Sequence, residues 1–250
     1  MALQEQLKRQ GDYLFKYRGY LPIIFLVFAL VVRGHYIHYG SNNSAVISSI
    51  STFMESIALY IGLFGIMIRL YAVGFTPKNT SGRNTSEGQI ADELNTTGLY
   101  SLTRNPLYVG NFFMWMGLVF YIGVIWFFFL FICMYWIYYE RIIFAEETFL
   151  REKFKEPYLH WANKTAVFIP KKISYLHPKK SFNWKKIIVK EKSTILMFFL
   201  VFFTLQQFSA FLEFNTTQIE LNQVTYGFLA SLSLYVLIKS LEVFEKLSAE

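Results

Sequence analysis

The chain has 250 residues, of which 54% are hydrophobic, 20% aromatic and 16% charged, with a formal net charge of +7. The charged residues are too few to cover a soluble domain with this much apolar surface. The composition therefore excludes an ordinary soluble protein and favours an integral membrane protein. The one cysteine, Cys133, lies in an apolar run and is expected to be a small hydrophobic side chain rather than a catalytic group.

Apolar segments of about 20 residues or more predict membrane helices. These segments lie near 20–37, 47–74, 106–144, 193–213 and 224–241. The third is too long for one span, and we expect it to break near 121–124 into a helical hairpin. The first lacks a small-residue cleavage site, so we expect it to be retained. The sequence therefore predicts an all-α integral membrane bundle of about six transmembrane helices.

Basic residues alternate with these segments along the chain. Lysines and arginines gather in the N-terminal segment, in the loops 75–105 and 141–192, and near the C-terminus, whereas the other loops have almost none. Because cytosolic loops are enriched in Lys and Arg, both termini and both polar loops are expected to face the cytosol, in a bacterial inner membrane or the endoplasmic reticulum. The positive charge then indicates topology and attraction to anionic lipids, and no nucleic-acid partner is expected.

The first informative polar segment is 74–111, which is rich in Gly, Asn, Ser and Thr and ends in "LTRNPLYVGN". Pro106 is expected in the first turn of a membrane helix, where its missing N–H has no consequence. The free backbone amides of that turn, together with Arg104, would form an anion-binding site at the membrane surface. The simpler alternative is that Arg104 only extends to the interface and Pro106 only begins a helix.

The second informative segment is 138–170, where Glu140, Glu146 and Glu147 follow the fourth span. Residues 148–155 predict an amphipathic helix that Pro157 ends. Carboxylates at the end of a membrane helix are unfavourable unless they are hydrated or paired. Their simplest role would be an ion pair between Glu147 and Arg151 at i,i+4 spacing.

Together the two segments carry an ordered motif: Gly-x-Tyr, then Arg-x-Pro-x-Tyr-x-Gly, then a hairpin, Glu-Glu and a closing Phe-x-Pro. The matching residues are Arg69, Gly98, Tyr100, Arg104, Pro106, Tyr108, Gly110, Glu146, Glu147, Leu150, Phe154, Tyr158, Phe168 and Pro170. In order and spacing this resembles the isoprenylcysteine carboxyl methyltransferase and phospholipid methyltransferase superfamily, over about residues 60–170. Two positions depart from its pattern: Asn105 replaces the usual histidine, and Lys155 replaces a glycine.

The resemblance implies an S-adenosylmethionine-dependent methyltransferase with its cofactor pocket at the cytosolic membrane surface. The cofactor would contact Gly98, Tyr100, Asn105, Pro106, Tyr108, Gly110, Glu146 and Glu147. Arg104 or Arg69 would hold a carboxylate or phosphate, and no metal is expected. The acceptor would be a membrane lipid or lipidated substrate, with an anionic headgroup such as the lipid A 1-phosphate or a prenylcysteine carboxylate.

The same resemblance divides the chain into an N-terminal membrane region (1–59), a methyltransferase-like core (60–170), and a basic linker with two additional helices (171–250). Two other functions stay open from the sequence. Membrane sterol reductases, which use NADPH, share an element like that at 104–108 but lack the Glu-Glu and Phe-x-Pro part. A scaffold or transporter is the second alternative, although no internal repeat is visible.

Overall fold

The computed structural model describes residues 2–40, 46–77, 83–85, 88–170 and 174–247. Parts of the predicted loops 75–105 and 141–192, and of the connection between the first two predicted spans, therefore lie outside it. Its elements are α1 (Leu3–Tyr17), α2 (Leu21–Gly40), α3 (Val46–Phe75), β1 (Arg83–Thr85), β2 (Gly88–Ile90), the 3-10 turn η1 (Leu99–Ser101), α4 (Pro106–Ile122), α5 (Ile125–Lys164), α6 (Trp184–Phe214) and α7 (Gln223–Leu247). The predicted all-α class is confirmed, apart from one short antiparallel hairpin of β1 and β2.

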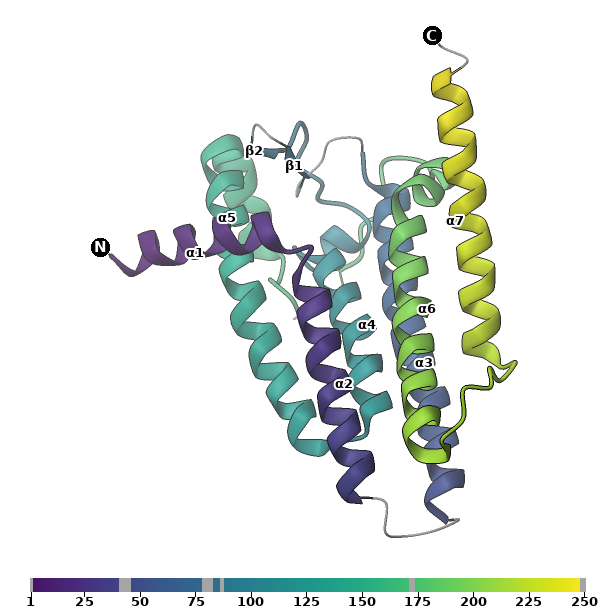
Figure 1. Ribbon diagram of the computed structural model, residues 1–250. Coiled ribbons are helices and arrows are strands. Elements are labelled where there is room, and N and C mark those ends of the chain that lie inside the picture. The colour runs from purple at the N-terminus through teal and green to yellow at the C-terminus, as the bar shows by residue number, and fades with distance from the viewer. Residues whose placement is uncertain (1, 41–45, 78–82, 86–87, 171–173, 248–250) are drawn as a thin grey trace.

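Helices α2 to α7 run roughly along a common axis, whereas α1 lies across one end of the bundle against α5 (Figure 1). The β1–β2 hairpin and the C-terminal end of α7 lie at that same end, and the α4–α5 and α6–α7 connections lie at the opposite one (Figure 1). The two ends of the chain and the polar segments thus share one end of the bundle. That this end faces the cytosol stays a prediction from the basic residues.

Within the part of the chain that the structure describes, four helical stretches are long and apolar enough to cross a membrane: Met54–Phe75, Ile125–Phe154, Trp184–Phe214 and Gln223–Glu242. The two other predicted spans correspond to the shorter apolar helices Ile23–Tyr39 and Pro106–Ile122, so the count of six stays a prediction. Large apolar side chains are exposed on the outer faces of the bundle, including Ile24, Val31, Phe129, Trp136, Val236 and Leu237. Such surfaces suit contact with lipid rather than water.

The predicted break at 121–124 is confirmed. α4 ends at Gly123, which takes a left-handed conformation (φ 74°, ψ 19°) and donates its N–H to the Val119 carbonyl. This is the helix ending that glycine favours, because it has no Cβ. α4 then packs tightly on α3, and a Cβ on Gly110 would lie 2.8 Å from the Gly65 carbonyl oxygen.

The amphipathic helix predicted at 148–155 is interrupted at its expected end, two residues before Pro157, but the chain returns to helix after the interruption. α5 continues to Lys164, and the interruption falls at Lys155, whose backbone is non-helical (φ 50°, ψ −123°). Pro157 lacks an N–H and its ring would collide with the carbonyl of Lys153, so a regular helix cannot pass through it. The chain instead kinks two residues earlier and starts a second helical segment with the proline near its beginning, where proline is tolerated.

The kink predicts an unusual stability change. Lys155 is exposed and holds a positive φ, a conformation that disfavours any residue except glycine by about 1–3 kcal/mol. We expect Lys155→Gly to raise the free energy of unfolding by about 1 kcal/mol. Lys153→Gly, also exposed but within the regular helix, should lower it by about as much. Denaturant titration in mixed micelles measures both, and a loss of stability in both variants would contradict the assigned kink.

Candidate functional site

A cavity of about 540 Å³ lies between α2, α3, α4, α5 and α6. Its polar end is lined by Arg18, Arg69, Tyr100, Arg104, Asn105, Tyr108, Asn111, Tyr139 and Glu146. Its apolar part is lined by side chains further along α2, α4 and α6, including Ile23, Met114, Trp115, Leu118, Met197, Phe198 and Phe202. The polar end lies where α4 begins, toward the end of the bundle that carries the polar segments. The cavity therefore matches an amphiphile, with a polar group at one end and apolar chain along the helices.

The polar segments that the sequence singles out are hydrogen-bonded to each other. The Arg104 N–H donates to the Ala166 carbonyl at 2.8 Å, and the Asn105 side-chain amide donates to the Val167 carbonyl at 3.0 Å. The Thr103 hydroxyl also donates to Val167, at 3.1 Å. These bonds fix the start of α4 against the segment that follows α5.

Arg104 joins the start of α4 to α5. Its Nη2 lies 2.9 Å from Glu147 Oε1, and its Nη1 donates to the Ala162 carbonyl at 2.9 Å. Its Nε is buried and has no hydrogen-bond partner within the described part of the chain. The ion pair that the structure gives Glu147 is thus with Arg104, rather than with Arg151 alone. An arginine with a buried N–H still available is suited to hold an anionic or carbonyl group of a ligand.

Tyr158 lies beside the Arg104–Glu147 pair and lines the same small cavity as these two residues. It packs with Tyr100 and Trp161, and the Trp161 indole N–H donates to the Tyr100 carbonyl at 3.0 Å. Burial, followed by the negative charge of Glu147, raises the pKa of the Tyr158 hydroxyl well above its usual range. The hydroxyl therefore stays protonated at physiological pH, and it is buried without a hydrogen-bond partner within the part of the chain that the structure describes.

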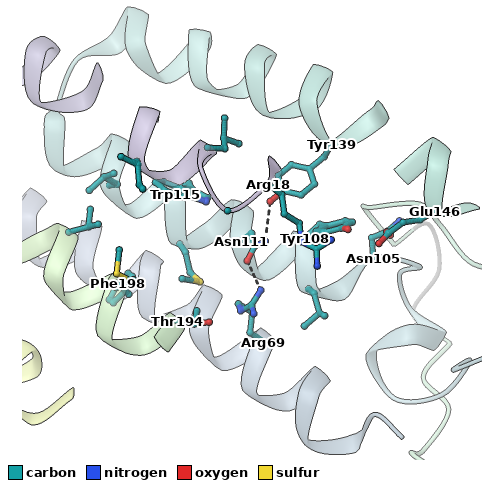
Figure 2. Close-up of a pocket in the computed structure, with 18 of the residues that line it drawn as sticks. Arg18, Arg69, Asn105, Tyr108, Asn111, Trp115, Tyr139, Glu146, Thr194 and Phe198 are labelled. Carbon is teal, nitrogen blue, oxygen red and sulfur yellow. Dashed lines mark hydrogen bonds between the residues drawn. The ribbon is translucent and has the colours of Figure 1, made fainter. Parts of the chain in front are cut away.

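Glu146 faces the other side of the helix, into the cavity. It lies next to the Tyr108 hydroxyl and near the positive charge of Arg18. Figure 2 shows Arg18, Tyr108 and Tyr139 gathered around Asn111, whose amide donates to the Tyr139 hydroxyl at 3.1 Å. A carboxylate, two phenols and an amide therefore surround one polar space.

Arg69 reaches this space from α3 (Figure 2). Its Nε and Nη2 donate to the two carboxylate oxygens of Glu191 at 2.9 and 2.8 Å, and its Nη1 donates to Asn111 Oδ1 at 2.6 Å. Glu191 belongs to α6 and is only 4% exposed. The charge of Arg69 is therefore balanced by an acidic residue from outside the predicted core, a contact that sequence reasoning missed.

Six of the predicted site residues line the cavity: Arg69, Tyr100, Arg104, Asn105, Tyr108 and Glu146. Glu147 instead lines a small adjoining cavity of about 30 Å³, which it shares with several of the same residues. Three predicted residues are not among the lining groups. Gly98 holds a positive φ of 62°, Pro106 begins α4, and Gly110 faces α3.

Sequence reasoning also missed Arg18, Asn111 and Tyr139 as lining residues. Asn111 directly follows the motif glycine Gly110, and a polar side chain at that point of an apolar helix is a signal that could have identified it. Arg18 has a weaker signal, because a basic residue just before a span is usual for topology alone.

The fold and site together define a membrane-embedded helical protein whose cavity joins a polar pocket at one end of the bundle to an apolar interior. Residues 56–157 match the family model described as phospholipid methyltransferase, which confirms the predicted resemblance for this part of the chain. No curated protein and no solved structure matches the chain. The match and the four long apolar helices of the described residues indicate a multi-pass membrane protein with a region similar to phospholipid methyltransferases.

Proposed function

We propose that the protein transfers a methyl group from S-adenosylmethionine to the headgroup of a membrane lipid or lipidated substrate. The observation that carries the proposal is the cavity, in which six residues of the predicted motif gather at the polar end of an otherwise apolar space. A water-soluble cofactor would occupy the polar end, and a lipid would enter from the bilayer along the apolar part. In a membrane, the polar end would face the cytosol, where the cofactor is available.

The residues present fit this cofactor. The volume is within the range of small-molecule sites. Carboxylates such as Glu146 are suited to accept from ribose hydroxyls or an amino group. The rings of Tyr108 and Tyr139, whose centroids are 4.5 Å apart, offer aromatic faces to a cation. When bound, S-adenosylmethionine supplies an electrophilic methyl group on a positively charged sulfur.

The side chains have mainly to bind, orient and exclude water, because the donor carries the driving force for transfer. Asn105 cannot titrate near neutral pH, so it is not proposed as a base. We propose that it holds the start of α4 through its bond to Val167. The remaining motif residues are likewise proposed to shape the site rather than to react: Gly98, Pro106 and Gly110 set the backbone, and Glu147 holds Arg104.

For the acceptor, we propose an anionic headgroup held by Arg104. Arg69 is less suited to this role than the sequence predicts, because Glu191 already occupies two of its donors. We also propose that α6 works with the core formed by residues 60–170, since it supplies both Glu191 and one wall of the cavity.

The experiment is transfer of labelled methyl from S-adenosylmethionine to a lipid panel in micelles. The panel contains an anionic lipid phosphate, a prenylcysteine carboxylate, and phosphatidylethanolamine as an amine acceptor. Labelling of an anionic lipid alone supports the whole proposal. Labelling of the amine alone would overturn the anionic acceptor but keep the methyltransferase, and labelling of none, with NADPH consumed instead, would overturn both.

A further inference from the structure

A second hollow lies outside the cavity, where α1 overhangs α5. α1 approaches α5 closely at Gly11, where a Cβ would lie 2.1 Å from the Arg141 carbonyl oxygen. The Arg141 Nε donates to Gln10 Oε1 at 2.9 Å, and Phe15 is only 2% exposed. These contacts hold α1 across the outside of α5, at the end of the bundle where the polar segments lie (Figure 1).

Below this crossing is a groove of about 570 Å³. Its apolar wall comes from Met134, Ile137 and Tyr138 on α5, and its upper rim comes from Arg9 and Tyr13 on α1 with Arg141 on α5. The α5 residues are spaced at i, i+3, i+4 and i+7, so they form one stripe of the helix. Arg141 is the member of this stripe nearest to the polar end, so charge and apolar surface are separated along the groove.

The two arginines can accept a further partner. Arg9 is exposed, and the described part of the chain gives it no hydrogen bond or ion pair. Arg141 uses its Nε for Gln10 and its Nη1 for the Ile137 carbonyl, and Nη1 also lies 3.6 Å from Glu140 Oε2, which leaves Nη2 for another acceptor. Met134 and Ile137 are 59% and 47% exposed, and Tyr13 is 63% exposed. Tyrosine at the rim is typical of the headgroup level of a bilayer.

We propose that this groove binds one anionic phospholipid, with its phosphate at Arg9 and Arg141 and an acyl chain along Met134 and Ile137. A guanidinium pair recognises a phosphate through charge and hydrogen bonds, and the bilayer supplies the chain directly to an apolar wall on the outside of a span. The groove shares no lining residue with the cavity. Lipid binding in the groove is thus independent of the proposed catalysis and requires only that the protein is embedded in a membrane.

Native mass spectrometry of the full chain in detergent tests this binding. The protein is mixed with equal amounts of phosphatidylglycerol and phosphatidylcholine that carry the same acyl chains. The wild type should retain one phosphatidylglycerol in preference to phosphatidylcholine. Arg9→Gln should reduce that preference about 5-fold, and Arg9→Gln with Arg141→Gln should remove it, because each arginine near anionic headgroups contributes a factor of this size.

Lys16→Gln is the matched control, since it removes the same charge from an exposed position of α1 outside the groove. It should retain the wild-type preference. Because Arg141 also holds α1, the single Arg9→Gln variant decides the case if the double variant is poorly folded. No preference in the wild type, or equal loss in Arg9→Gln and Lys16→Gln, would overturn the site.

Discussion

Replacing Arg104 by alanine should lower methyl transfer to membrane lipid by about 100-fold, because it removes the cation that pairs with Glu147 and a buried N–H that has no partner in the described part of the chain. The side chains of Arg104 and Glu147 are only 14% and 22% exposed, so the carboxylate that remains would be left largely out of water without its partner. The measurement is incorporation of labelled methyl into lipid by purified protein, with thermal unfolding measured in parallel.

Two variants separate this effect from a general loss of charge. Arg104→Lys keeps the charge but cannot contact both Glu147 and the Ala162 carbonyl in the same planar geometry, so most of the activity should still be lost. Arg151→Gln removes an exposed arginine one turn from Glu147 and should change activity less than about 2-fold. If Arg151→Gln were as damaging as Arg104→Ala, the assigned pair would be wrong.

Replacing Glu191 by leucine should lower the free energy of unfolding by about 3–5 kcal/mol, because it leaves the buried Arg69 guanidinium without its carboxylate. The pair is bidentate, and Arg69 and Glu191 side chains are only 16% and 5% exposed. Denaturant titration in mixed micelles measures this change. Lys190→Leu, an exposed neighbour on the same helix, should stay within about 0.5 kcal/mol of the wild type.

A double variant distinguishes stability from function at the same site. Arg69→Leu with Glu191→Leu replaces the whole ion pair by apolar groups, which is often neutral for stability, so most of the lost free energy should return. Methyl transfer should not return, because Arg69 lines the cavity and orients Asn111. Full activity in the double variant would show that Arg69 serves stability alone.

The apolar runs and the glycine at position 123 predict most of the helix boundaries. The spans follow from the length of the apolar runs, and the hairpin break follows from Gly123, whose left-handed backbone other residues disfavour. Pro157 also predicts that the helix over 148–155 ends before it, but the conformation of the kink in α5 could not be predicted. Proline at position 157 indicates an interruption but does not fix which earlier residue absorbs it, and an exposed lysine at 155 gives no sign of a positive φ.

The candidate site could likewise be predicted only in part. Residues in the ordered motif, such as Arg104 and Glu146, could be predicted because they lie in polar segments beside apolar helices. Glu191 could not, since its role depends on α6 packing against α3, a contact between parts of the chain 122 residues apart. Glu147 pairs with Arg104 rather than Arg151 because of how α4 and α5 pack, and residue spacing along one helix gives no information on that packing.

The central claim is that the polar end of the cavity binds S-adenosylmethionine, and the most direct measurement is calorimetric titration of the detergent-purified protein with S-adenosylhomocysteine. We expect saturable binding that Glu147→Ala abolishes, because that variant releases Arg104 from its position at the polar end of the cavity. Arg151→Gln should bind as the wild type does. Failure of the wild type to bind S-adenosylhomocysteine, or saturable binding of NADPH in its place, would contradict the account.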